Sequence, residues 1–224
     1  AMADGSSAAP DPSTRTTLTV EKPFVYGSAA VPLPKNEKDE AQSHTHRWTV
    51  YLRGLENEDL SYYISKVTFG LHESFKDPVR AIETPPYEVV ETGWGEFPIL
   101  ITVHFRDSSE SPVSFYHHLK LFPKNKSEAG NGKPVMSEMY DEFIFHHPTL
   151  RMKDLLAKKP EKKFTEHRLM PYFDTQGFLA MEQDHIQKLQ AATKQVSERM
   201  DELRQRLYVV DEEIMQLDKI ARQN

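Results

Sequence analysis

The sequence predicts an all-β fold, an immunoglobulin-like sandwich of two sheets, followed by a C-terminal α-helical coiled coil. Residues 16–147 contain short runs in which apolar and polar side chains alternate, and turn-forming residues separate these runs. From residue 186 the apolar side chains instead recur with the period of a coiled coil, about 3.5 residues. A chain of 224 residues is long enough for one core and one extended element.

Seven strands are predicted in the first part of the chain. Alternation is clearest in three runs, each with an apolar face and with Thr, Lys or His between its members. This pattern is typical of antiparallel strands with one buried face. The three faces are Trp48, Val50 and Leu52; Val67, Phe69 and Leu71; and Ile99, Ile101, Val103 and Phe105. The predicted strands span 17–27, 46–54, 62–72, 87–92, 97–105, 113–122 and 142–147.

The chain divides into four predicted segments. The first is small, polar and contains Pro, so we expect a disordered arm. The second is the sandwich, and its loop 123–137, rich in Gly, Asn, Pro and charge, is expected to be mobile. Thr149 is expected to cap a short helix that Pro160 ends, and a polar linker then leads to the coiled-coil helix. The four segments are 1–15, 16–150, 151–177 and 178–224.

The C-terminal helix is predicted to pair through one narrow apolar seam. With Met200 at an a position, the a and d positions are apolar except at Thr193. In a parallel homodimer the flanking charges give one attraction and two repulsions, so a homodimer is tolerated rather than favoured. The alternatives are a helix of another subunit in a larger assembly and, less in keeping with so narrow a seam, a helix packed on its own sandwich. The seam residues are Ile186, Leu189, Val196, Met200, Leu203, Leu207, Val210, Ile214 and Leu217.

Composition disfavours several function classes. The absence of cysteine removes disulfides, thiolate metal sites and thiol nucleophiles, and it is typical of an intracellular protein. A net charge of -6 argues against a nucleic-acid backbone as the main partner. No apolar run approaches the roughly 18 residues of a membrane helix. We therefore expect no membrane partner and no direct sequence-specific nucleic-acid partner.

Neither an enzyme motif nor a recognisable metal site is found in the sequence. The patterns G-x-S-x-G, H-E-x-x-H and the P-loop do not occur. The ten histidines include His44 and His46, which can share a strand face, and the adjacent pairs 117–118 and 146–147. Adjacent strand residues point to opposite faces, and no spaced carboxylate completes a ligand set. We expect no enzyme, no cofactor and no metal.

Two loops carry residue types that a simple turn does not need. The stretch KVTFGLHESFKDP delays its Asp-Pro turn signal, which leaves His72, Ser74 and Phe75 in a loop. The stretch ETGWGEFP places Trp94 between two glycines, which permit a ligand to approach the neighbouring amides closely. A tight turn whose tryptophan covers an open end of the sandwich is the alternative interpretation.

If both loops lie at one end of the sandwich, they form an aromatic slot with polar groups at its floor. A cation would need an aromatic cage with a nearby carboxylate. A neutral amide instead stacks between two rings and takes one hydrogen bond at each end. The residues therefore predict a ligand that is flat and uncharged.

Four stretches resemble the YEATS domain in order and spacing across residues 16–150. They are HTHRW, VTFGLHESF, PPYEVVETGWGEFPILITVHF and YHHLKLFP. YEATS domains are immunoglobulin-like readers of acylated lysine on histone tails, so the resemblance implies this fold and this activity. The coiled coil resembles the branch of the family shared by a histone-acetyltransferase complex and a histone-variant-exchange remodeller. This implies a subunit of such complexes, located in the nucleus.

The resemblance also implies a role for each slot residue. Phe75 and Trp94 would sandwich the planar acyl-amide, and the Ser74 hydroxyl would hydrogen-bond to it. The backbone N–H of Trp94 would bond the acyl oxygen, and Gly93 would give the main chain room to do so. His72 would hold Ser74 and line the slot.

Further residues are implied at the wall and mouth of the slot. Phe97 would close the far wall, and an open end would admit crotonyl as well as acetyl groups. His44 stands where certain members have an aromatic residue, and His118 stands where some have an acid, which bears on the preference for flanking sequence. The residues expected to contact the peptide around the acyl-lysine are His44, Gly95, Glu96 and His118.

The lead hypothesis is a chromatin reader of acetyl- or crotonyl-lysine on histone tails that acts as a subunit of a larger complex. The alternative is a histone-binding scaffold or chaperone that does not read the mark. The two differ because only the reader needs Phe75 and Trp94 for tail binding. An enzyme is the third hypothesis and would have to show turnover or a tight metal.

Overall fold

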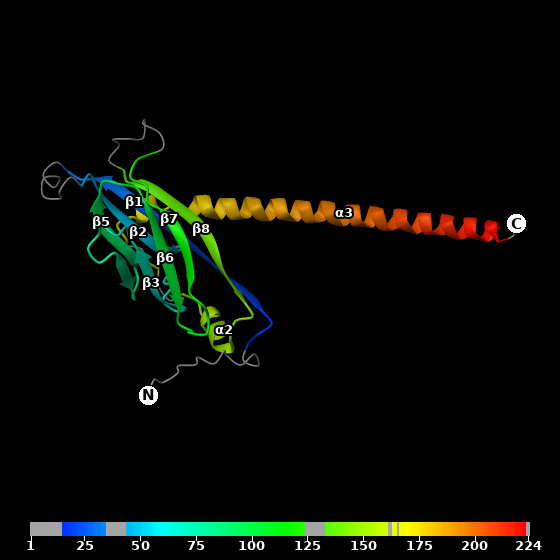
Figure 1. Cartoon of the computed structure of the whole chain (residues 1–224), viewed down its shortest axis with the longest axis horizontal. Coiled ribbons are helices and arrows are strands. Elements are labelled where there is room, and N and C mark those ends of the chain that lie inside the picture. Colours follow the sequence, from blue (N-terminus) through cyan, green and yellow to red (C-terminus); the bar gives the residue numbers. More distant parts are fainter. Residues whose placement is uncertain (1–14, 35–43, 124–132, 161–162, 165, 223–224) are drawn as a thin grey trace. The chain divides into compact units, whose positions relative to one another are not determined.

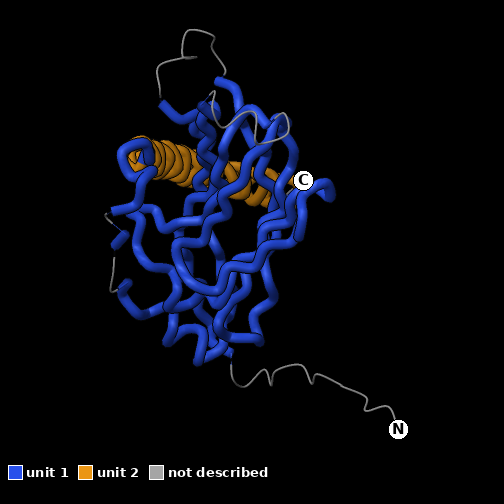
Figure 2. Tube along the Cα trace, turned by 90° about the vertical axis from the view of Figure 1, so that its left-hand side faces the viewer, with its two compact units in different colours: residues 1–174 blue, residues 175–224 orange. Residues whose placement is uncertain are grey.

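The computed structural model describes residues 15–34, 44–123, 133–160, 163–164 and 166–222. The chain forms two compact units, residues 1–174 and residues 175–224 (Figure 2). The predicted disordered arm, apart from Arg15, lies outside the described residues, and so do residues 124–132 of the predicted loop 123–137.

The first unit contains two antiparallel sheets of four strands each, which form the two layers of a sandwich (Figure 1). One sheet has the strand order β5-β2-β1-β8 and the other has the order β4-β3-β6-β7. The prediction of a two-sheet β-sandwich is confirmed. The strands are β1 (Thr19–Pro32), β2 (His46–Gly54), β3 (Ile64–Gly70), β4 (Val79–Ile82), β5 (Tyr87–Gly93), β6 (Pro98–Phe105), β7 (Val113–His118) and β8 (Val135–His146).

The predicted strand bounds agree best where alternation is strict. β2 has the predicted bounds, and β6 starts one residue later than predicted. The sequence prediction misses β4, because VRAI is short, partly exposed and directly follows Pro78. β8 begins at Val135 rather than at Glu142, since its first half carries Met, Glu and Asp at partly exposed positions that hide the alternation. The predicted number of seven strands is therefore corrected to eight within the residues that the structure describes.

The core between the sheets is built mainly from aromatic and branched side chains. Trp48 and Tyr63 are fully buried there. The rings of Phe24 and Phe143 stack with their centroids 3.8 Å apart, which joins β1 to β8. The three predicted apolar faces are confirmed as buried, with Leu71 only partly buried at the edge of the core.

A short helix, α2 (Leu150–Leu156), follows the sandwich. Its cap is the predicted Thr149, whose Oγ1 accepts a hydrogen bond from the Met152 N–H at 3.0 Å and donates one to the carboxylate of Asp107. The side chains of Met152 and Leu156 are buried in the main core. The helix thus ends before Pro160, as expected, and is attached to the sandwich by its apolar face.

Residues 166–174, which belong to the predicted linker, pack against the sheet β5-β2-β1-β8. Leu169 is 8% exposed and forms a small cluster with Ala29 and Tyr51. A single 3-10 turn, η3 (Met170–Tyr172), follows Leu169. This part of the chain is therefore not a free linker but belongs to the first unit.

A buried ion pair lies beneath the same segment. The side chains of Arg53 and Glu138 are each 5% exposed, and Arg53 Nη2 lies 2.9 Å from Glu138 Oε1. Tyr51 donates its hydroxyl proton to the same carboxylate at 3.0 Å, and Arg53 also donates to two nearby backbone carbonyls. The Arg53 guanidinium lies 4.2 Å from the ring centroid of Phe173. The two charges of this cluster thus pair with each other away from water, with Arg53 Nε donating to Glu138 Oε1 at 3.0 Å, although the buried Arg53 Nη2 makes no hydrogen bond of its own among the described residues.

The second unit is one helix, α3 (Thr175–Ala221), of 47 residues. None of its described side chains is buried, and the predicted seam residues are 40–67% exposed. Ion pairs one turn apart, such as Lys188 with Asp184 and Arg199 with Glu202, lie along its surface. The predicted helix is confirmed, and its pairing in a coiled coil stays a prediction. In the described part of the chain, no helix combines the length and the apolar character needed to span a membrane.

The adjacent histidines of β7 differ in burial, and we expect protonation of the buried one, His117, to destabilise the fold. His117 is 3% exposed and its Nε2 lies 2.9 Å from Ser28 Oγ, whereas His118 is exposed. Burial, with a smaller contribution from His118, lowers the pKa of His117 to about 4. Between pH 4 and the unfolded value near 6.5 the unfolded chain binds more protons, so stability falls as pH falls. We predict a loss of about 2 kcal/mol between pH 7 and pH 5 in urea unfolding.

The His117→Gln variant should lose this pH dependence, and the matched surface variant His118→Gln should keep it. An equal pH slope in the wild type and in His117→Gln would contradict the prediction.

Removal of one partner of the buried ion pair should destabilise the first unit strongly. Glu138→Ala leaves the Arg53 guanidinium buried without its carboxylate, which should cost about 3–5 kcal/mol of unfolding free energy in urea or guanidinium titrations. Glu56 pairs with Lys163 at the surface, with side chains 54% and 56% exposed. The control Glu56→Ala should therefore change stability little. Similar losses in both variants would show that the burial of the Arg53–Glu138 pair is unimportant.

Candidate functional site

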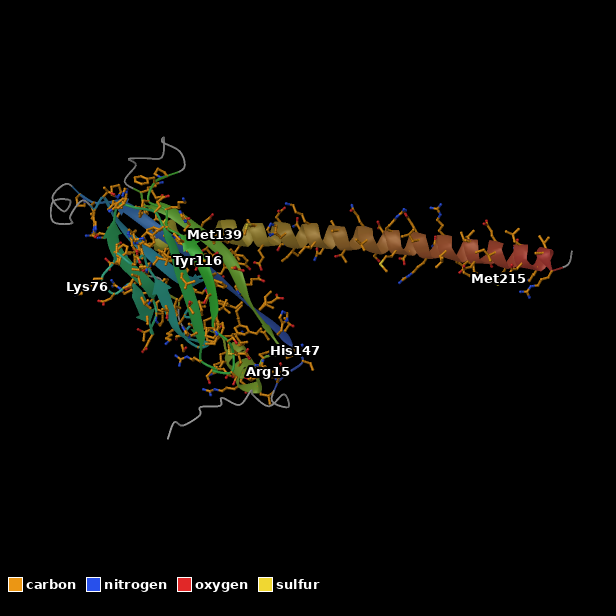
Figure 3. All side chains as sticks on the ribbon, in the orientation of Figure 1. Arg15, Lys76, Tyr116, Met139, His147 and Met215 are labelled. Atoms are coloured by element: carbon orange, nitrogen blue, oxygen red, sulfur yellow. The ribbon has the colours of Figure 1, made fainter. Side chains whose placement is uncertain are left out.

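A pocket of about 620 Å³ lies where the loop between β3 and β4 meets the loop between β5 and β6. We call this pocket the slot. The structure brings together in it the two unusual loops of the sequence analysis. Lys76, labelled in Figure 3, projects from the first of these loops. The predicted site residues that line the slot are His44, His72, Ser74, Phe75, Gly93, Trp94, Gly95, Glu96 and Phe97.

The loop after β3 orients the Ser74 hydroxyl. The Ser74 backbone N–H donates to His72 Nδ1 at 3.2 Å, so this ring nitrogen is an acceptor and carries no proton. Ser74 Oγ lies 2.9 Å from the same nitrogen and must therefore donate its proton to it. The lone pairs of Ser74 Oγ remain available to accept a hydrogen bond in the slot. The Phe75 N–H donates to the His72 carbonyl at 3.1 Å, which places the Phe75 ring next in the loop.

The second loop presents Trp94 at the end of β5. Its side chain is 69% exposed, and its ring contacts no other ring in the part of the chain that the structure describes. Before it, the Gly93 carbonyl accepts a hydrogen bond from the Thr45 N–H at 3.0 Å. The Trp94 backbone N–H has no hydrogen-bond partner among the described residues. Trp94, a residue of the slot lining, therefore offers a backbone donor without a partner among the described residues, and Ser74 offers an acceptor.

Aromatic rings form the inner wall of the slot. The ring of Trp48 meets Phe75 edge to face at 5.7 Å and Phe97 at 5.8 Å between centroids. Phe75 and Phe97 are 5.6 Å apart. A Cβ atom at position 93 would lie 3.2 Å from Trp48 Nε1 and 3.9 Å from Phe75 Cζ. Because glycine has no Cβ atom, position 93 leaves this part of the inner wall unobstructed.

Three charged residues at the slot are missed by the sequence analysis: Lys76, Arg80 and Glu91. Arg80 Nη2 lies 2.8 Å from Glu91 Oε1 and donates to the Lys76 carbonyl at 2.7 Å. Arg80 lies on β4, the strand that the sequence prediction misses. A correct prediction of β4 would have placed Arg80 in register with Phe69 of β3 and so near the slot.

Glu96 turns its carboxylate toward the segment that follows β7. Its oxygens accept hydrogen bonds from the Leu121 N–H at 2.8 Å and the Phe122 N–H at 3.3 Å, and they pair with Lys120 Nζ at 3.0 Å. Burial alone would raise the pKa of Glu96, but these hydrogen bonds and the Lys120 charge together lower it. Glu96 thus lines the slot, while its carboxylate is bonded to residues 120–122 behind the slot.

The two histidines expected to contact flanking peptide lie in different places. His44 lines the slot, and its Nδ1 lies 2.7 Å from Thr92 Oγ1. His118 is exposed on β7 opposite Pro98 and does not belong to the slot lining. The structure thus places His44 in the slot lining and His118 outside it.

A second pocket, of about 420 Å³, lies between the start of β7 and the end of β8. At the end of the sandwich that carries α2, Arg15 lies beside His147 (Figure 3) and donates to its carbonyl oxygen at 3.0 Å. Arg15 also pairs with Glu110 at 3.4 Å, so these charges satisfy each other rather than a ligand. Among the residues that the structure describes, no three His, Asp or Glu side chains are grouped to hold a metal ion.

The amino-acid sequence is similar to curated proteins over most of its length. A sequence model of the YEATS family matches residues 43–123. The Protein AF-9 homolog of Eremothecium gossypii is 38% identical over 195 residues, which cover 85% of this chain and 92% of that protein. The Protein AF-9 homolog of Saccharomyces cerevisiae is 36% identical, with 85% and 90% covered. Transcription initiation factor TFIID subunit 14b of Arabidopsis thaliana is 37% identical, with 87% and 80% covered.

Solved structures show the same fold. A crystal structure described as the Yaf9 YEATS domain bound to H3K27ac is 40% identical, with a TM-score of 0.58 over 64% of this chain and 97% of that one. A structure described as the Yaf9 YEATS domain recognizing an H3K122suc peptide has the same identity and coverage, with a TM-score of 0.55. The fold, the slot and the similarity over most of the length of the relatives agree, and the chain belongs to the YEATS family.

Proposed function

We propose that this protein is a chromatin reader that binds acylated lysine on histone tails in the slot. One observation carries the proposal: the Ser74 acceptor and the free Trp94 N–H donor occur together beside aromatic rings. An acyl-lysine amide offers an N–H, a carbonyl oxygen and a flat face, which require this set of partners. The Yaf9 structures, described with acetylated and succinylated histone peptides, support the proposal.

Each slot residue then has one task. The acyl-amide lies between the faces of Phe75 and Trp94, its N–H donates to Ser74 Oγ, and its oxygen accepts from the Trp94 N–H. His72 holds the Ser74 hydroxyl so that its lone pairs point to the ligand. Gly93 leaves room for the amide to approach the main chain.

Selectivity against unmodified lysine follows from the same groups. An ammonium cannot accept the Trp94 N–H bond, and its removal from water costs several kcal/mol when no carboxylate is free to pair with it. The carboxylates of Glu91 and Glu96 at the slot are already paired with Arg80 and Lys120. Acylation removes the charge and supplies the acceptor that the slot requires.

Beyond the amide, Phe97 bounds the far wall of the slot. The slot accepts an acetyl group and, where its end is open, a planar crotonyl group that extends the stacked surface. His44 and Gly95 at the slot, together with His118 on β7, contact the residues that flank the acyl-lysine. These contacts set the preference for the sequence around the acyl-lysine, whereas the slot itself sets the requirement for the acyl group.

The protein acts as a subunit of a chromatin-modifying or transcription complex in the nucleus. Its relatives include a protein named as a TFIID subunit, which supports membership of such an assembly. The exposed seam of α3 is the surface through which it would join other subunits or a second copy. A single slot binds its acyl-lysine with modest affinity. Pairing of two chains through α3 brings two slots together and so raises the overall affinity through avidity.

Replacement of Trp94 should strongly reduce discrimination between acylated and unmodified tails. In calorimetric titrations of the full chain with matched unmodified, acetylated and crotonylated histone-tail peptides, Trp94→Ala should weaken acyl-dependent binding about tenfold or more. The loss combines a stacked face of about 0.5–1.5 kcal/mol with disorder of the amide donor. Tyr116 on β7, labelled in Figure 3, is 68% exposed and lies outside the slot lining. Tyr116→Ala is therefore the matched control and should bind as the wild type does.

Equal binding of all three peptides, or full binding by Trp94→Ala, would contradict the reader. Equal binding of all three peptides would favour instead a histone-binding scaffold or chaperone that ignores the mark.

The α3 seam should govern association of the chain. In a parallel homodimer Arg206 meets Asp211, but Arg199 meets Arg204 and Glu213 meets Asp218, so repulsion exceeds attraction. We predict weak self-association that strengthens from 150 mM to 500 mM salt, because screening weakens the net repulsion. Sedimentation velocity over a range of protein concentrations measures this dependence.

Leu207→Glu, at a seam residue 63% exposed, should remove the self-association, whereas Met215→Glu, off the seam and 60% exposed, should not. Identical sedimentation of both variants and the wild type would show that the seam does not mediate self-association.

A further inference from the structure

The loop 94–97 carries Trp94, and its first two residues, Trp94 and Gly95, have few contacts of their own, whereas Phe97 packs against Trp48 and Phe75. The loop lies between the end of β5 and the start of β6. Trp94 is largely exposed, and a Cβ atom added at Gly95 would meet no atom within 4 Å. Glycine enlarges the set of backbone conformations open to the loop. The Thr45 N–H holds the Gly93 carbonyl, and so one end of the peptide unit that carries the Trp94 N–H. The backbone that follows, through Trp94 and Gly95, needs a second point of attachment.

Glu96 supplies a connection of this kind. One oxygen of its carboxylate accepts two backbone hydrogen bonds, from Leu121 at 2.8 Å and Phe122 at 3.3 Å. The other oxygen pairs with Lys120 Nζ at 3.0 Å. Charge-assisted hydrogen bonds of this type are stronger than neutral ones. Three groups of one segment thus hold a single side chain of the loop.

The segment that receives Glu96 is itself fixed in the core. Leu119 and Leu121 are fully buried, and the Leu119 N–H donates to the Phe97 carbonyl at 3.0 Å. The ring of Phe122 meets His46 edge to face with centroids 5.0 Å apart. The loop is thereby tied to a part of the chain that burial holds in place.

We propose that Glu96 is a positioning residue, which clamps the loop 94–97 to residues 119–122 so that the slot is formed before acyl-lysine binds. A site that is already ordered loses less entropy on binding, so the clamp raises affinity without a contact to the ligand. This role differs from the direct peptide contact that the sequence analysis expects of Glu96. The inference takes its ligand, acyl-lysine, from the proposed function. The clamp itself does not depend on that function.

Two ligands separate the clamp from a direct contact with the histone tail. The first is an acylated histone-tail peptide with its basic flanking residues. The second is the small probe Nα-acetyl-Nε-crotonyl-lysine methylamide, which has no flanking residues to meet Glu96. NMR titration of the full chain measures the affinity for both.

Glu96→Ala should weaken binding of both ligands by the same factor, roughly five- to tenfold. Glu96→Gln keeps a side-chain oxygen for the Leu121 and Phe122 amides and should restore most of the affinity. Lys120→Met removes only the partly exposed ion pair and should bind about as well as the wild type. Thermal melting of each variant shows that the sandwich remains folded.

Amide hydrogen exchange in the free protein tests the clamp without any ligand. In Glu96→Ala the exchange of the Leu121 and Phe122 amides should accelerate, and the Trp94 and Gly95 amides should show increased motion in ¹⁵N relaxation. If the wild type binds neither ligand, the proposed function is wrong. The exchange and relaxation measurements would still show whether Glu96 holds the loop.

Two results would overturn the inference. A loss of affinity in Glu96→Ala for the histone peptide alone would assign Glu96 to direct contact with the tail. Unchanged affinity for both ligands, with unchanged amide exchange and relaxation, would show that the loop holds its position without Glu96.

Discussion

The contact of Trp48 with the slot connects the ligand site to the core of the sandwich. The indole is fully buried between the sheets, and its edge also supports Phe75 and Phe97. The main chain at Gly93 lies so close to the indole nitrogen that a side chain there would crowd it. The slot is therefore an extension of the packed core rather than a cleft between mobile loops, and its inner wall has the rigidity of close-packed protein.

Much of the sandwich and most of the slot can be predicted from the sequence, for identifiable reasons. Strict alternation around Trp48 gives the bounds of β2, because one buried face leaves little freedom in register. The residue types in the two loops indicate the slot, since Ser74 and Trp94 are unnecessary for a turn. Arg80 is missed because β4 is short and partly exposed. The docking of Leu169 is also missed, because a single apolar residue in a polar stretch has no periodicity.

Charge is arranged so that the slot can bind a neutral group although the chain carries a net charge of -6. The two carboxylates that line the slot, Glu91 and Glu96, are each paired with a cation, Arg80 and Lys120 respectively. Their charges are therefore largely balanced at short range. Under the proposed function, the Ser74 hydroxyl and the Trp94 amide are then the polar groups left to meet an acyl-amide. An unmodified lysine would find no unpaired carboxylate among the residues that line the slot.

The docking of residues 166–174 on the outer face of one sheet sets where the folded unit ends. A fragment cut near residue 150 would retain the slot but uncover Tyr51 and the Arg53–Glu138 pair, which this segment shields. Water would then reach a charge pair and an apolar cluster that are otherwise covered, and the exposed face would favour aggregation. The fragment boundary that respects the fold is Asp174. A fragment cut near residue 150 also lacks α2, whose Met152 and Leu156 are buried in the main core, so it would lose stability as well as the cover of this face.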